Sequence, residues 1–158
     1  MTTHQGDLLT DYDTAGKEIK ALIADTSSDQ VLDAAVTYLY EAFEKYSWVG
    51  IYVIKDNVLV LNSWRGPQAT KHTRIPVGRG ICGAAAQSGR VERVSDVAQD
   101  ERYLACFIST KSEIVVPIKK AGKVIGEIDI DSDVTNAFDD HDALFLERVA
   151  TLLSEYIG

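Results

Sequence analysis

The sequence predicts an α+β fold in which one layer of antiparallel sheet carries helices on one side. Three observations predict it: two stretches near the N-terminus have apolar residues at helical spacing, the middle of the chain holds alternating apolar segments separated by turn residues, and a last helical stretch closes the chain. With 158 residues, of which 46% are hydrophobic, we expect a single domain over residues 1–158 with one sizeable core.

The first two predicted elements are helices. The first begins near Asp11 and the second near Ser28, and each places its apolar residues on one stripe. A helix with a single apolar face is expected to cover a sheet or a partner subunit. The N-terminal residues before Asp11 are polar and carry no structural prediction of their own.

The period then changes from helix to strand. Alternation predicts strands over residues 48–54 and 58–64, joined by a turn at Asp56-Asn57. In the first strand, Trp48, Gly50 and Tyr52 share a face, and the glycine between two aromatic residues predicts a hollow flanked by their rings.

Residues 74–83 form the stretch around which the chain is organised. Gly78, Gly80 and Gly83 surround Cys82 where an extended run gives way to a short helix, which we expect to end at Gly89. A cysteine at the start of a helix lies near unpaired N–H groups and the helix dipole, so the pattern favours a thiolate at Cys82.

Further strands are predicted over residues 91–94, 113–118 and 124–131, the last two joined by a turn at residues 121–122. In the last strand, one face is predicted to carry Val124, Gly126, Ile128 and Ile130, and the other Glu127, Asp129 and Asp131. A helix capped by Asp139 closes the chain. It is predicted to pack through Leu144, Phe145, Val149, Leu152, Leu153 and Tyr156.

Composition excludes several classes of function. The net charge of −8 argues against a nucleic-acid partner, and no apolar run is long enough to cross a membrane. The N-terminus shows no secretory signal, so we expect a cytoplasmic protein. Two cysteines do not make a disulfide framework, and the three histidines have no metal-ligand spacing with them, so we expect no bound metal.

The carboxylates of the last strand suggest chemistry. Asp129 and Asp131 are expected to project from one face with Cβ atoms about 6–7 Å apart. In a partly covered site two such groups cannot both ionise freely, so one is expected to keep a proton that it can give to an oxygen leaving group. The ionised neighbour can hold an ammonium group.

Each of these features also has a structural explanation. The acidic face can be a solvated strand surface, and Glu113 at a strand start can be simply exposed. Trp48 and Tyr52 can be core or interface aromatic residues. The two cysteines can be small buried hydrophobic residues.

Three motifs, taken together, resemble the free methionine-(R)-sulfoxide reductases built on a GAF domain: RIPVGRGICG, an Ala-Cys pair ahead of SEIVVPI, and GEIDIDS. The similarity extends over essentially the whole chain. It implies a GAF-like fold with N- and C-terminal helices on one face of an antiparallel sheet and a ligand pocket on the other. It also implies an enzyme that reduces free L-methionine (R)-S-oxide to L-methionine with no bound cofactor.

The resemblance also assigns roles to individual residues. Cys106 matches the cysteine that attacks the sulfoxide sulfur. Carboxylates that bind the oxidised amino acid and assist departure of its oxygen are matched by Glu113, Asp129 and Asp131.

Aromatic residues that wall the pocket around the substrate methyl are matched by Trp48 and Tyr52. A third cysteine that family members often carry just before RIP is replaced here by His72. Cys82 is then the only internal thiol able to resolve a sulfenic acid on Cys106, and an external thiol is the alternative. The resemblance further implies a thioredoxin-like dithiol as reductant and a homodimer.

A second hypothesis is a stand-alone GAF module that senses a small ligand or a cyclic nucleotide without catalysis. Residues 136–142, NAFDDHD, faintly resemble part of a cyclic-nucleotide GAF signature, but the lysine expected after Asn136 is missing. A helix N-terminus capped by Asp139 explains the same residues. We expect a sensor to need an output domain, for which 158 residues leave no room.

Overall fold

A computed structural model describes residues 11–104 and 109–158. The described helices and strands are, in chain order, α2 (Tyr12–Ala24), η1 (Ser28–Gln30), α3 (Val31–Ala42), β1 (Trp48–Lys55), β2 (Val58–Arg65), β3 (Arg74–Pro76), α4 (Gly80–Ser88), β4 (Glu92–Val94), η2 (Val97–Gln99), β5 (Ser112–Lys120), β6 (Lys123–Ser132), α5 (Asp140–Leu153) and η3 (Ser154–Tyr156).

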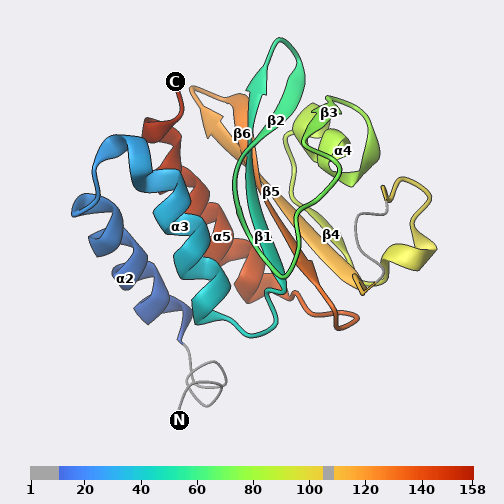
Figure 1. Ribbon diagram of the computed structural model, residues 1–158, viewed down its shortest axis with the longest axis horizontal. Helices are drawn as coiled ribbons and strands as arrows, with labels where there is room; N and C mark the ends of the chain where they lie inside the picture. Colours follow the sequence, from blue (N-terminus) through green and yellow to red (C-terminus); the bar gives the residue numbers. More distant parts are fainter. Residues whose placement is uncertain (1–10, 105–108) are drawn as a thin grey trace.

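One sheet organises the molecule. Its six strands follow the order β3-β2-β1-β6-β5-β4, and each neighbouring pair is antiparallel. Helices α2, α3 and α5 cover one face, whereas α4 and the chain around β3 lie against the other (Figure 1). The predicted α+β architecture, with terminal helices on one face, is therefore confirmed.

Alternation along the strands separates two hydrophobic clusters. The larger cluster packs α2, α3 and α5 against one sheet face through residues such as Ile51 and Ile114. The smaller cluster packs α4 on the opposite face against Tyr52, Leu59 and Val115. Successive side chains of a strand point to opposite faces, so β1 and β5 contribute to both clusters.

The glycine stretch folds tightly, as its sequence predicts. A Cβ on Gly83 would lie 2.8 Å from the carbonyl oxygen of Pro76, so only glycine fits between α4 and β3. The amide of Gly78 donates a hydrogen bond of 2.9 Å to the carbonyl of Gly83. Gly89, at φ 70°, ends the helix as predicted.

The two hairpin turns are also confirmed. Both residues of each turn have left-handed φ values: Asp56 52°, Asn57 63°, Ala121 53° and Gly122 81°. Positive φ at both central residues is the mark of the type I′ turn, which joins two strands in a two-residue hairpin because it matches their right-handed twist.

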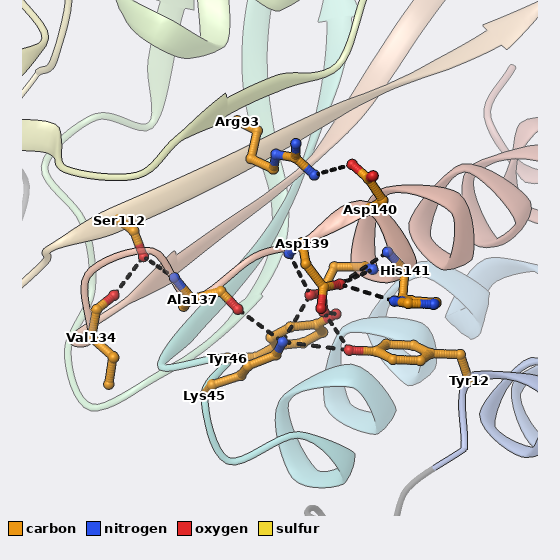
Figure 2. Close-up of polar contacts among 11 residues, drawn as sticks. Tyr12, Lys45, Tyr46, Arg93, Ser112, Val134, Ala137, Asp139, Asp140 and His141 are labelled. Carbon is orange, nitrogen blue, oxygen red and sulfur yellow. Dashed lines mark hydrogen bonds and ion pairs between the residues drawn. The ribbon is translucent and has the colours of Figure 1, made fainter.

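A network of polar side chains fixes the start of α5 (Figure 2). Asp139 caps the helix in a reciprocal capping box with Asp142, as predicted for Asp139. The fully buried carboxylate of Asp142 also accepts hydrogen bonds from the hydroxyls of Tyr46 (2.6 Å) and Tyr12 (3.0 Å) and forms an ion pair with Lys45 at 2.8 Å. The network joins α2, α5 and the chain after α3.

Two sequence-based expectations are wrong. Leu144 is 62% exposed, and Leu146 is buried in the core instead. Val124 packs with the smaller cluster, whereas Ile125 packs with the larger one. The β5–β6 register shifts beside Lys119, and this irregularity breaks the simple alternation on which the prediction depended.

Within the described residues, no helix is long and apolar enough to cross a membrane.

Candidate functional site

Strand register brings the predicted acidic residues together. Asp131 on β6 is the direct partner of Glu113 on β5 and of Trp48 on β1. Asp129, two residues before it, lies opposite Gly50. Side chains directly opposite each other in an antiparallel pair have Cβ atoms about 4.5–5.5 Å apart, so the three carboxyl groups form one cluster.

The cluster is buried, on the sheet face opposite the three large helices. Glu113, Asp129 and Asp131 are 5%, 5% and 4% exposed. The alternative of a solvated acidic strand face is therefore wrong, and so is that of an exposed Glu113. Ile81 and Cys82 of α4, together with Tyr103 and Leu104, line the same cavity as these residues.

A small cavity lies where these carboxyl groups meet. Its volume is about 20 Å³, room for one water molecule. Its described wall carries one thiol and three carboxyl groups, those of Cys82, Glu113, Asp129 and Asp131. Aromatic and apolar side chains complete the described wall, among them Tyr52, His72, Ile75, Ile81 and Leu104.

Burial determines how the carboxyl groups ionise. It raises the pKa of Glu113 well above its usual range, and the charges of Asp129 and Asp131 raise it further. Burial and the charge of Asp129 likewise raise the pKa of Asp131. The pKa of Asp129 is also raised by burial, but nearby Glu113 and Cys82 can donate hydrogen bonds to its carboxylate and offset part of the effect. Burial and mutual repulsion therefore disfavour simultaneous ionisation of the three carboxyl groups.

Cys82 belongs to the same cavity. Its Sγ atom lies 3.9 Å from Oε2 of Glu113, and the residue is 6% exposed. Burial raises the pKa of the Cys82 thiol well above its usual value, and the charges of Asp129, Glu127 and Glu113 raise it further. The expectation that the helix start favours a thiolate is therefore wrong, because burial beside carboxylates outweighs the helix dipole.

Glu127 is a buried residue that the sequence reasoning did not single out. It is 0% exposed, and neither of its carboxyl oxygens has a hydrogen-bond partner within residues 11–104 and 109–158. Burial and the charge of Asp129 raise its pKa well above the usual range, and the nearby Cys82 thiol offsets part of this effect. Alternation along β6 could have identified Glu127, because it places this residue on the same face as Asp129 and Asp131.

The two aromatic candidates differ in position. Tyr52 lines the cavity and donates a hydrogen bond of 2.7 Å to the carbonyl of His72. Trp48 lies on the same sheet face, but it is not among the described residues that line the cavity. Its ring covers Gly50, where an added Cβ would lie 2.4 Å from Cη2 of Trp48, so the hollow expected at this glycine is filled. Trp48 also stacks on Trp64, with ring centroids 6.2 Å apart.

Cys106, the candidate nucleophile, lies outside the described residues. Described residues on either side of it reach the cluster. Leu104 lines the cavity, and the hydroxyl of Thr110 donates a hydrogen bond of 3.3 Å to Oδ2 of Asp131.

A larger hollow of about 730 Å³ lies between α4 and the two hairpin turns. Its described walls contain no cysteine and none of the buried carboxyl groups. Size alone does not provide proton donors or a nucleophile, so the small acidic cavity is the candidate site.

Comparison with known proteins points to one group of enzymes. The GAF domain model matches residues 27–157. The free methionine-R-sulfoxide reductase of Escherichia coli (strain K12) is 35% identical over 148 residues, which are 93% of this chain and 88% of that protein.

Solved structures agree with this similarity. A type II free methionine-R-sulfoxide reductase from Thermoplasma acidophilum is 39% identical with a TM-score of 0.79, and the match covers 87% of this chain and 94% of that one. The Neisseria meningitidis enzyme, solved in complex with its substrate, is 37% identical with a TM-score of 0.85. This match covers 92% of this chain and 87% of that one.

Proposed function

Because the chain belongs to the GAF-domain family of free methionine-R-sulfoxide reductases, we propose that it reduces free L-methionine (R)-S-oxide to L-methionine. One observation carries this proposal beyond family membership. A thiol, Cys82, and three carboxyl groups share one buried cavity on the pocket face of the sheet. Reduction of a sulfoxide by thiols needs these two kinds of group, a sulfur nucleophile or resolving thiol and a proton donor.

The carboxyl cluster accounts for selection of a free amino acid. An ionised Asp129 can pair with the ammonium group of the substrate, and a methionine sulfoxide within a peptide has no such charge. Removal of this anion from water is costly unless a cation compensates it, so the cavity favours an ammonium ligand. Tyr52, which lines the cavity, is proposed to contact the substrate methyl, and Trp48, whose ring covers Gly50, is proposed to close the pocket from the same sheet face.

The first chemical step is assigned to Cys106. Its sulfur attacks the sulfoxide sulfur, while a protonated carboxyl group of Glu113 or Asp131 gives its proton to the sulfoxide oxygen. The attack joins the two sulfur atoms. The protonated oxygen then forms a bond to the sulfur of Cys106 as its bond to the substrate sulfur breaks, and cleavage of the sulfur–sulfur bond releases methionine and leaves Cys106 as a sulfenic acid. Such general acid assistance is worth about 10²–10⁴-fold in rate. The raised pKa values of Glu113 and Asp131 support this role, since the acid must still hold its proton near neutral pH.

Resolution of the sulfenic acid is assigned to Cys82. Its thiol attacks the sulfur of oxidised Cys106, water leaves, and a disulfide joins the two residues. A thioredoxin-like dithiol then reduces this disulfide and is itself oxidised. His72, which lines the cavity, cannot take this part because an imidazole does not form a disulfide.

Three further properties belong to the same proposal. The whole chain, residues 1–158, is one GAF-like domain that forms a homodimer. No cofactor is required, because thiols supply both electrons. A thioredoxin-like reductant implies a reducing compartment, and we place the enzyme in the cytoplasm.

The decisive test is a thioredoxin-coupled assay that follows NADPH oxidation with free R-, free S- and peptide-bound methionine sulfoxide. We expect turnover with the free R form alone. Cys106→Ser should abolish it, and Cys82→Ser should abolish turnover with thioredoxin while a small external thiol restores part of it. Full activity of Cys106→Ser contradicts the assigned nucleophile. Absence of turnover, together with saturable binding of a cyclic nucleotide, would favour the sensor hypothesis.

A further inference from the structure

Three ligand atoms of different chemistry converge in the acidic cavity. Cys82 offers Sγ, and Glu113 and Asp129 each offer a carboxylate oxygen, and these atoms all lie within 4.8 Å of one another. The Sγ atom is 3.9 Å from Oε2 of Glu113. The three residues come from α4, β5 and β6, so packing of separate elements sets this arrangement.

A second, independent observation points to a cation at this place. Oδ1 of Asp129 is buried and makes no hydrogen bond within the described part of the chain, and the same holds for Oδ1 of Asp131. The ion pairs of the described residues all lie elsewhere, so no lysine or arginine described here compensates these carboxylates. Buried carboxylate oxygens without a donor are costly, and a bound cation removes that cost.

The donor set selects the kind of cation. Mg²⁺ and Ca²⁺ prefer six or more oxygen ligands, and sulfur does not suit them. Zn²⁺ accepts a mixture of cysteine sulfur and carboxylate oxygen in a four-coordinate site, with zinc–sulfur and zinc–oxygen distances of about 2.3 and 2.1 Å. A tetrahedral arrangement at these distances places ligand atoms about 3.5 Å apart. Cys82 and Glu113 therefore need to approach by a few tenths of an ångström, and no other ligand pair by more than about 1.4 Å.

The spacing of the histidines and cysteines predicted no bound metal, but the tertiary structure brings a thiol and two carboxyl groups together. We propose that Cys82, Glu113 and Asp129 form a site for a thiophilic divalent cation, with Zn²⁺ as the fitting ion. The cavity of about 20 Å³ accommodates a single ion or water. Three protein ligands leave a fourth position for water, as in zinc sites that remain open to exchange.

Zinc at this site has a functional consequence. The ion occupies the carboxylates that the substrate ammonium group needs, and it ties up the Cys82 thiol. Zinc therefore acts as a reversible inhibitor that competes with methionine sulfoxide. This inhibition rests on the function proposed above, whereas binding of the ion does not.

Binding is tested without activity. Fully reduced protein carrying Cys106→Ser, in which Cys82 is the only thiol, is titrated with zinc chloride against a chromophoric chelator. We expect one zinc ion per chain. Adding Cys82→Ser or Asp129→Asn should weaken binding at least tenfold, whereas the matched change Asp133→Asn, at an exposed position just after β6, should leave it unchanged.

Cobalt provides a second measurement that does not depend on a substitution in the cluster. Co²⁺ added to the Cys106→Ser protein should give the near-ultraviolet charge-transfer absorption of a thiolate ligand and the visible bands of tetrahedral cobalt. The proposal is overturned if the Cys106→Ser protein binds no zinc, including the case in which the wild type does bind it. It is also overturned if binding survives the additional replacement of Cys82. Octahedral cobalt without a thiolate band overturns it equally.

The inhibition has its own readout. In the coupled assay, zinc should raise KM for methionine sulfoxide with little change in kcat, and a chelator should restore the rate. Zinc binding without any sulfoxide reduction would leave the ion site in place and refute the proposed enzyme. Reduction that is insensitive to saturating zinc would refute the inhibition while the proposed enzyme stands.

Discussion

Glu113 on β5 and Asp131 on β6 are direct partners in the antiparallel ladder, and both carboxyl groups are buried. Like charges in this position destabilise a strand pair. The conflict is resolved if at least one of the two groups keeps a proton, and burial raises the pKa of both. The register of two strands thus favours a retained proton at this pair, and the proposed reaction needs such a proton.

Replacement of the proposed proton donor tests this relationship. Glu113→Gln removes the proton but keeps the shape of the side chain, so we expect kcat for free methionine sulfoxide to fall about 10²-fold or more. The control is Glu41→Gln on the exposed face of α3. Steady-state kinetics of both variants give the comparison, and an unchanged kcat for Glu113→Gln would assign the proton to another group.

Glu127 makes stability depend on pH. Its pKa is raised in the folded protein above the ordinary value of 4.5, so its stabilising contribution is complete below pH 4.5 and is lost as the pH rises toward the folded value. Glu127→Gln should remove that loss. Its advantage over the wild type should grow by about 1.4 kcal/mol per pH unit from pH 4.5 up to the pKa of Glu127 in the folded protein and stay constant above it.

Urea unfolding over a series of pH values measures this effect. Glu155→Gln, at an exposed position, serves as the control and should follow the wild-type profile. Parallel profiles for Glu127→Gln and the wild type would show that Glu127 ionises normally in the folded protein.

Cys82 should react slowly with a disulfide reagent. In the Cys106→Ser protein it is the only thiol, it is 6% exposed, and burial raises its pKa. Since the thiolate is the reactive form, we expect a rate at neutral pH at least about tenfold below that of the same protein unfolded in urea. Equal rates in the two states would indicate an accessible, ionised thiol.

The network at the start of α5 should dominate local stability. Asp142→Ala leaves Lys45 and the hydroxyls of Tyr12 and Tyr46 without their shared acceptor, at a cost of about 3–5 kcal/mol. Asp140→Ala, on the same turn, removes only an ion pair with Arg93. The Asp140 carboxylate is 88% exposed, so its loss should cost less than about 1 kcal/mol. Equal losses in thermal or urea unfolding would contradict the importance assigned to Asp142.

Two helical glycines should respond in opposite directions. Gly83→Ala places a methyl group 2.8 Å from the carbonyl of Pro76 and should destabilise the protein by about 1–3 kcal/mol. Gly16→Ala, in α2, meets only the Arg148 guanidinium at 3.9 Å and should stabilise it by about 0.5–1 kcal/mol. Chemical denaturation of the two variants distinguishes these signs.

The fold was largely predictable because its signals are local. Amphipathic helices, strand alternation, turn residues and the Asp139 cap each depend on a few neighbouring residues, and the structure confirms them. The prediction was wrong for Leu144, where several apolar residues follow one another and only packing selects the buried one. It was also wrong at Val124, because a strand irregularity is a property of two paired strands.

The sequence by itself determined which face of β6 carries Asp129 and Asp131, since alternation along one strand needs no partner. Tertiary structure alone decided that these acids are buried, that Asp131 pairs with Glu113, and that Cys82 lies against them as a thiol with a raised pKa. The physical reason is that ionisation depends on what covers a group. Here the covering elements, α4 above all, come from distant parts of the chain and meet the acidic strand only when the sheet is assembled.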